Sequence, residues 1–181
     1  MSGSSRLSLL YQRALASAPQ ILLVMGVAGS GKTTVGRATA TALGWQYFEA
    51  DDFHSPANRE KMSRGVPLDD ADRAPWLQSI RGKLDELRAA GNGAVFTCSA
   101  LKESYRQVLL VGTSGTRLVH LAGDPEILRQ RLQQRTGHFM PAALLDSQLA
   151  VLELPVNALT LDIRLSPAQL VRAILADLSQ A

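Results

Sequence analysis

One loop limits the folds open to this chain more than any other feature. Gly26 to Thr33 reads GVAGSGKT and matches the pattern G-x-x-x-x-G-K-[ST]. Five apolar residues, 21–25, precede the loop, and a segment of helical length, 33–43, follows it and stops at Gly44. An ordinary glycine-rich turn would not need Lys-Thr at its end. The pattern therefore predicts a nucleoside triphosphate site between a strand and a helix.

The residues of this loop are expected to have different roles in binding phosphate. Glycines let the backbone amides approach the phosphates, and the helix N-terminus faces them. We expect Lys32 to neutralise the β-phosphate and the hydroxyl of Thr33 to coordinate Mg²⁺. The predicted nucleotide-binding residues of the loop are Gly26, Val27, Ala28, Gly29, Ser30, Gly31, Lys32, Thr33 and Thr34.

Strands and helices alternate along the rest of the chain. Apolar runs predict strands at 21–25, 45–50, 94–98, 117–122 and 159–163. Helical periodicity and cap signals predict helices at 33–43, 58–64, 75–90, 102–111, 124–135, 142–152 and 166–178. Strands separated by helices require parallel crossovers, so we predict a three-layer α/β/α sandwich around a five-stranded parallel sheet. Ligands should bind at the carboxyl ends of the strands.

Length and composition define one domain. The 181 residues, 46% of them hydrophobic, suit a single core at 21–181. Residues 1–20 are expected to be a frayed or helical extension, with an organellar transit segment as the less favoured alternative. Two inserts, about 53–77 and about 135–154, follow strands and should overhang the ligand edge, the second as a lid.

Charge and cysteine content restrict the partners. The net charge is +3 without a dense basic tract interleaved with aromatics, which favours small phosphorylated or carboxylated ligands over nucleic acid. No apolar run approaches the length of a membrane helix, so no membrane partner is expected. Cys98 is the single cysteine and is expected to be a buried packing residue, which favours a reducing compartment, the cytoplasm by default.

A carboxylate beside the loop distinguishes a kinase from other triphosphate-binding proteins. The strings N-K-x-D and D-x-x-G of a GTPase do not occur in the sequence, and strand 94–98 lacks a terminal aspartate. Glu49 and Asp51 are then the best-placed carboxylates, on one face if the segment stays extended. A solvated acidic loop is the alternative. Asp51 is predicted to orient the nucleophilic hydroxyl or to hold the metal.

Longer strings spread over about 21–155 resemble the gluconate kinases, small P-loop kinases related to shikimate and nucleoside monophosphate kinases. Beyond the loop, the matching strings are DDFH at 51–54 with Asn58 and Lys61-Met62, GVPLDDADRAPWL at 65–77, CSALK at 98–102 with Tyr105-Arg106, and RTGHFMP at 135–141 with Ser147-Gln148. The sequence departs from the family at Glu49, where relatives often have Asp, and after Glu153, where relatives tend to have a second proline and acidic residues.

This resemblance implies an activity and a set of residues. It implies transfer of the ATP γ-phosphoryl group to the 6-hydroxyl of D-gluconate, with Mg²⁺, by a homodimer. The predicted catalytic residues are Lys32, Asp51 and Arg135, with Thr33 and Asp51 toward the metal. Arg131 and Arg135 are predicted for the nucleotide: they stand at i, i+4, and Arg135 adjoins the break at 137–141, which favours a lid over the phosphates for Arg135, with a solvated helix face as the alternative for both. The candidates for the polyol and its carboxylate are Asp51, His54, Arg73, Lys102, Arg106 and His138. Which arginine binds the carboxylate stays open.

Two other functions are weighed against this one. A shikimate or nucleoside monophosphate kinase would share the fold, and only the insert at 54–73 speaks against it. A nucleotide-binding regulator without transfer chemistry would not need Lys32, Thr33 and Asp51 together.

Overall fold

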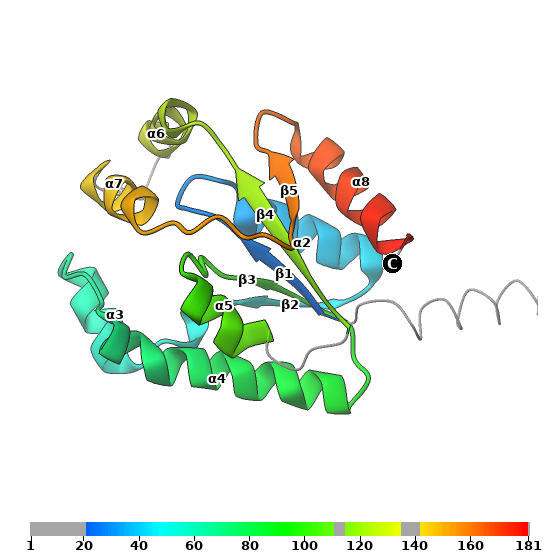
Figure 1. Cartoon of the computed structure of the whole chain (residues 1–181), viewed down its shortest axis with the longest axis horizontal. Helices are drawn as coiled ribbons and strands as arrows, with labels where there is room; N and C mark the ends of the chain where they lie inside the picture. The colour runs from blue at the N-terminus through cyan, green and yellow to red at the C-terminus, as the bar shows by residue number, and fades with distance from the viewer. Residues whose placement is uncertain (1–20, 111–114, 135–141, 181) are drawn as a thin grey trace, which may run out of the picture.

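The central element is a five-stranded parallel sheet in the order β2-β3-β1-β4-β5 (Figure 1). The computed structural model describes residues 21–110, 115–134 and 142–180. The strands are β1 (Ile21–Met25), β2 (Gln46–Glu49), β3 (Ala94–Thr97), β4 (Thr116–Ala122) and β5 (Leu159–Asp162). All five strands were predicted, and the parallel sheet confirms the fold class.

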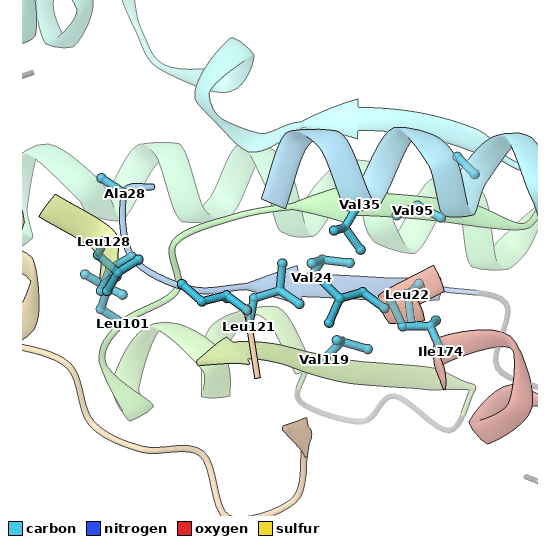
Figure 2. Packing of buried hydrophobic residues seen from close by; sticks show 14 of the residues in the cluster. Leu22, Val24, Ala28, Val35, Val95, Leu101, Val119, Leu121, Leu128 and Ile174 are labelled. Carbon is cyan, nitrogen blue, oxygen red and sulfur yellow. The ribbon is translucent and has the colours of Figure 1, made fainter. Parts of the chain in front are cut away.

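Alternating side chains of β1 supply the cores on both faces of the sheet. Leu22 and Val24 enter one cluster, and Ile21, Leu23 and Met25 enter the other, all at 0% exposure. Residues on the first face pack with α2 (Lys32–Leu43) and α8 (Pro167–Leu178), as Figure 2 shows for Val35 and Ile174. The second face is covered by α4 (Asp70–Ala89) and α5 (Glu103–Leu110). A strand buried on both faces explains why 21–25 is apolar throughout.

The remaining helices lie beyond the carboxyl ends of the strands (Figure 1). They are the 3₁₀ turn η1 (Ala50–Phe53), α3 (Pro56–Ser63), α6 (Pro125–Gln133) and α7 (Ala142–Ala150). Asp124 caps α6 through the amide of Glu126, and Ser166 caps α8 through the amide of Gln169, as their Asp-Pro and Ser-Pro signals predicted. These segments surround the edge where ligands were expected.

Several expected boundaries differ from the structure, and two of these differences bear on the site. The helix predicted from 75 begins at Asp70, because Asp69 and Asp72 form a reciprocal capping box and Pro75 lies inside the helix. Pro75 is the sixth residue of this helix, so the hydrogen bond that its N–H would have donated to the carbonyl of Ala71 is missing. The strand predicted at 45–50 ends at Glu49, where η1 begins. Among the described helices, none is long and apolar enough to span a membrane.

Candidate active site

The phosphate-binding loop has the backbone that its sequence requires. Gly29 and Gly31 have φ angles of 80° and 93°, in the region that favours glycine. Gly31 is the N-cap of α2 and has no side chain to cap it, so the first amides of α2 are available to an anion. The ammonium group of Lys32 donates to the carbonyl of Val27 at 3.0 Å, inside the curve of the loop. This arrangement is suited to a polyphosphate.

A pocket lies beside the phosphate-binding loop. Its lining residues are Gly29, Ser30, Gly31, Thr34, Val35, Arg131, Leu165, Pro167 and Leu170. Arg131, predicted for the nucleotide, donates to the carbonyl of Ile163 at 2.6 Å, which holds it at the pocket wall. Leu165 and Pro167 were not predicted. Their place after the last strand, at the ligand edge of the sheet, was the available signal.

Glu49 connects the second strand to the phosphate-binding loop. Its carboxylate accepts hydrogen bonds from the hydroxyls of Thr33 at 3.1 Å, Tyr47 at 2.5 Å and Thr97 at 2.6 Å. Tyr47 and Thr97 are also 2.8 Å apart. Thr97 ends β3, where many triphosphate-binding proteins carry an aspartate, so a carboxylate from the edge strand reaches across it. Tyr47 and Thr97 were missed by the sequence reasoning.

Asp51 lies in η1, and the expectation that the chain stays extended to this residue is wrong. The turn nevertheless keeps Asp51 in electrostatic contact with Lys32, Glu49 and Arg73. Its side chain is reached by solvent, yet the protein atoms around it raise its pKa by desolvation, with Lys32 acting in the opposite direction. Asp51 is thus placed between the loop and the cations of α4.

Three predicted cations have three different environments. Lys102 forms an ion pair with Asp70 at 2.7 Å, and the hydroxyl of Tyr105 also donates to Asp70. Arg73 donates from Nε to the carbonyl of Leu68 at 3.3 Å and lies 5.9 Å from the centre of the Tyr105 ring. Within 21–110, 115–134 and 142–180, no carboxylate forms an ion pair with Arg73.

Arg106 differs from the other two. Its side chain is only 2% exposed, and it bonds to the carboxylate of Glu103 and to the carbonyls of Ala100 and Leu101. Ala100 has a φ of 42°, a conformation that costs energy in a residue with a Cβ. The geometry therefore has Arg106 hold the loop that precedes Lys102.

His54 and Trp76 stack at 4.6 Å near the same edge, and the indole of Trp76 donates to the carbonyl of Ala50 at 2.7 Å. Burial, with Arg73 and Arg59 nearby, lowers the pKa of His54 to about 4. Its Nδ1 is buried without a hydrogen-bond partner in the described part of the chain. Cys98 is buried as predicted, and burial raises the pKa of its thiol to about 12. A thiol held in that state is not a nucleophile.

Arg135 and His138 lie outside the described residues, as do residues 136–141 of the predicted lid. The described site therefore consists of the phosphate-binding loop, the Glu49 hydrogen bonds, Asp51, His54, Arg73, and the pair Lys102–Asp70. Fold and site together define a P-loop kinase that acts on a small molecule.

Comparison with known proteins agrees with this class. Residues 21–155 match the family described as an AAA domain. The chain is 56% identical over 137 residues to a gluconokinase of Gluconobacter oxydans, covering 76% of this chain and 77% of that protein. The crystal structure of a gluconokinase from Sinorhizobium meliloti superposes with a TM-score of 0.81 at 44% identity, covering 90% of this chain and 93% of that one. A shikimate kinase from Aquifex aeolicus shares the fold, with a TM-score of 0.54 at 15% identity.

This chain belongs to the gluconokinase family.

Proposed function

We propose that this protein transfers the γ-phosphoryl group of ATP to the 6-hydroxyl of D-gluconate. The observation that carries the proposal is the position of Asp51, whose carboxylate interacts with Lys32 of the phosphate-binding loop and with Arg73 of α4. A hydroxyl bound to Asp51 would lie between a group that binds phosphate and a group that binds carboxylate. The similarity to gluconokinases supports the same substrates.

Asp51 orients the reacting hydroxyl and accepts its proton. Desolvation raises its pKa, which makes its carboxylate a stronger base than an aspartate with the ordinary pKa. Lys32 and the N-terminal amides of α2 cover the developing charge on the phosphoryl oxygens. Arg135, predicted to belong to the lid, would add to this positive charge.

Arg73 binds the carboxylate of gluconate. Among the cations proposed for this task, Lys102 is neutralised by Asp70, and Arg106 is buried among carbonyls and Glu103. Arg73 has no such partner among the described residues and can offer the forked guanidinium that binds a carboxylate with two hydrogen bonds. Lys102, His54 and the His138 that the resemblance implies are left for the hydroxyls of the polyol, with Arg106 acting through the loop it holds.

Thr33 and Glu49 fit the metal that the family implies. A hydroxyl and a carboxylate 3.1 Å apart beside the phosphate-binding loop are the hard oxygen ligands that Mg²⁺ prefers, and Asp51 adds a second carboxylate nearby. Mg²⁺ held by these residues would neutralise part of the phosphate charge. We further propose a homodimer, from the family resemblance, and the cytoplasm, from the single buried cysteine.

A panel of acceptors tests the proposal. Release of ADP is measured with gluconate, glucose, shikimate and AMP, each at several concentrations. We expect gluconate to be preferred over glucose by at least about tenfold, because a neutral sugar leaves Arg73 unpaired inside the site. Preference for shikimate or AMP would favour another small-molecule kinase, and no transfer to any acceptor would favour a nucleotide-binding regulator.

Two arginine variants separate the binding residue from a general charge effect. Arg73→Met should raise KM for gluconate while KM for ATP changes little. Arg64→Met is the matched control, because Arg64 is exposed at 64% and its only described ion pair, to Glu60, is 3.7 Å long. Equal effects of the two substitutions on KM for gluconate would remove Arg73 from the carboxylate site.

A further inference from the structure

One peptide group of the phosphate-binding loop is held from both sides. The carbonyl of Val27 accepts a hydrogen bond from the Lys32 ammonium group at 3.0 Å. The amide of Ala28, in the same peptide group, donates to Oε1 of Gln148 at 2.7 Å. Gln148 belongs to α7, 120 residues further along the chain. It lies in a string shared with the gluconate kinases, but the site described above gives it no role.

The position of Gln148 is fixed by its own helix. Leu145 of α7 is fully buried in the core cluster that also contains Ala28 and Leu128. Asp146 forms an ion pair with Arg129 of α6 at 2.9 Å. These contacts attach α7 to α6 and to the core, so the carboxamide is presented from a packed element.

Helix α6 contacts the same loop. A Cβ added to Gly29 would lie 3.1 Å from the carbonyl oxygen of Leu128 and 3.1 Å from the side chain of Leu132, and both residues belong to α6. Figure 2 shows Ala28 beside Leu128. The loop therefore packs on α6 through its apolar side and bonds to α7 through its Ala28 amide.

A peptide group is planar and trans, so its N–H and C=O point in opposite directions. Fixing the Ala28 N–H therefore also fixes the Val27 carbonyl to which Lys32 bonds. We propose that Gln148 is a positioning residue that acts through the Val27–Ala28 peptide to place the Lys32 ammonium group for the terminal phosphates of ATP. This inference rests on the proposed function for its catalytic consequence, but its structural step concerns nucleotide binding alone.

Replacement of Gln148 by methionine, which has a similar length and no strong acceptor, is the direct test. The variant should bind a non-hydrolysable ATP analogue about three- to tenfold more weakly, the effect of one neutral hydrogen bond. ADP affinity should fall less, because the lysine of such loops reaches the β- and γ-phosphates. Gln130→Met on α6 is the matched control, since the Gln130 side chain is exposed and, among the described residues, donates a hydrogen bond only to Glu126. It should change neither affinity.

A double-mutant cycle with Lys32→Met decides whether Gln148 acts through Lys32. If it does, Gln148→Met should change the affinity for the ATP analogue by less than about twofold once Lys32 is absent. An equal loss with and without Lys32, or an equal loss for ATP analogue and ADP, would overturn the proposal and leave Gln148 as packing.

Two further measurements separate misfolding and loss of transfer activity from an effect on nucleotide binding. Thermal unfolding of each variant shows whether it folds; if Gln148→Met does not, the smaller Gln148→Ser takes its place in the same cycle. Turnover with gluconate is recorded separately. A wild-type protein that binds the ATP analogue but phosphorylates no gluconate would refute the proposed function, while the binding cycle would still decide the role of Gln148.

Discussion

Adjacent aspartates in η1 have different surroundings. Asp51 interacts with Lys32, Glu49 and Arg73, and desolvation raises its pKa. Both side chains are exposed, but for Asp52 it is the backbone carbonyl that accepts a hydrogen bond, from Arg59 at 2.5 Å. The difference between the two carboxylates arises from the turn of the backbone and not from the order of residues.

Asparagine substitutions at these two positions give the first prediction. Asp51→Asn should lower kcat with gluconate by about a hundredfold or more, because the amide cannot accept the proton of the reacting hydroxyl. Asp52→Asn should stay within about threefold, as for an exposed side chain without a special contact. Steady-state kinetics with both substrates measure the two effects. Equal losses would show that Asp51 has no special role in the transfer.

The sequence was enough to predict which residues lie near the site, but not which hydrogen bonds and ion pairs they form. Period-two alternation placed Glu49 and Asp51 on one face, but the strand ends at Glu49 and a 3₁₀ turn brings Asp51 back to Lys32. Similarly, the sequence around a lysine or arginine does not show which carboxylate or carbonyl it will bind in the folded chain. Only the fold shows that Asp70 forms an ion pair with Lys102 and that Arg106 donates its hydrogen bonds to the loop before its own helix.

Strands β2 and β3 together place a carboxylate beside the phosphate-binding loop. Glu49 at the end of β2 supplies it, because β3 ends in Thr97 and not in an aspartate. Burial and the neighbouring Glu49 raise the pKa of Tyr47, so its phenol remains a hydrogen-bond donor at neutral pH. Together with Thr97 it holds the Glu49 carboxylate toward Thr33. A glutamate side chain is one methylene longer than that of an aspartate, and two donors restrict its extra freedom.

Removal of one of these donors gives the second prediction. Tyr47→Phe should raise the Mg²⁺ concentration needed for half-maximal activity by about three- to tenfold, because one hydrogen bond orienting Glu49 is lost. Thr97→Val should act in the same direction. Thr160→Val on β5, an exposed position, is the control. Activity titrated with Mg²⁺ measures the shift, and an unchanged half-saturation would separate Glu49 from the metal.

Helix α5 supports the third prediction. Arg106→Met should lower the free energy of unfolding by about 2 kcal/mol or more, because the carbonyls of Ala100 and Leu101 lose a buried donor. Urea unfolding measures this change. KM for gluconate should rise less than in Arg73→Met, which in turn should leave stability nearly unchanged. The reverse pattern would make Arg106 the carboxylate ligand.

Helix starts could be predicted from the sequence where the local signals agree. Asp124-Pro125 and Ser166-Pro167 start α6 and α8 as expected, since cap and proline agree there. In α4 the two signals conflict: Pro75 suggests a first position, whereas the capping box of Asp69 and Asp72 starts the helix earlier. The capping box starts the helix five residues before Pro75, although the proline interrupts the hydrogen bonds inside it.

Assembly is the first property of the whole molecule to be tested. The homodimer that we propose would have twice the chain mass of 19.5 kDa. Leu154 and Val156, exposed at 72% and 92%, are the most exposed large apolar side chains among the described residues. Light scattering should give the dimer mass for the wild type, and Leu154→Glu with Val156→Glu should reduce it if this segment lies in the interface. A monomeric wild type would refute the dimer.

Stability against acid depends on histidines buried in the folded chain. The pKa of His54 is lowered to about 4, and desolvation also lowers the pKa of His120. Between pH 6.5 and pH 4 the unfolded chain therefore binds a proton at His54 that the folded chain does not. Stability should fall as pH decreases through this window. The lowered pKa values of Asp70 and Asp162 act separately, below their ordinary value of 3.8.

Substitution of His54 isolates its share of this pH dependence. From pH 7 to pH 5 the wild type should lose about 2 kcal/mol of unfolding free energy through His54 alone, since one pKa unit corresponds to about 1.4 kcal/mol. His54→Gln should lose correspondingly less over the same interval, although its stability at pH 7 also falls because the stacking on Trp76 is gone. Urea unfolding at the two pH values measures both quantities, with His120→Gln as a second buried histidine for comparison. If His54→Gln loses as much stability as the wild type between pH 7 and pH 5, then the folded protein takes up a proton at His54 over this interval and burial does not keep its ring neutral.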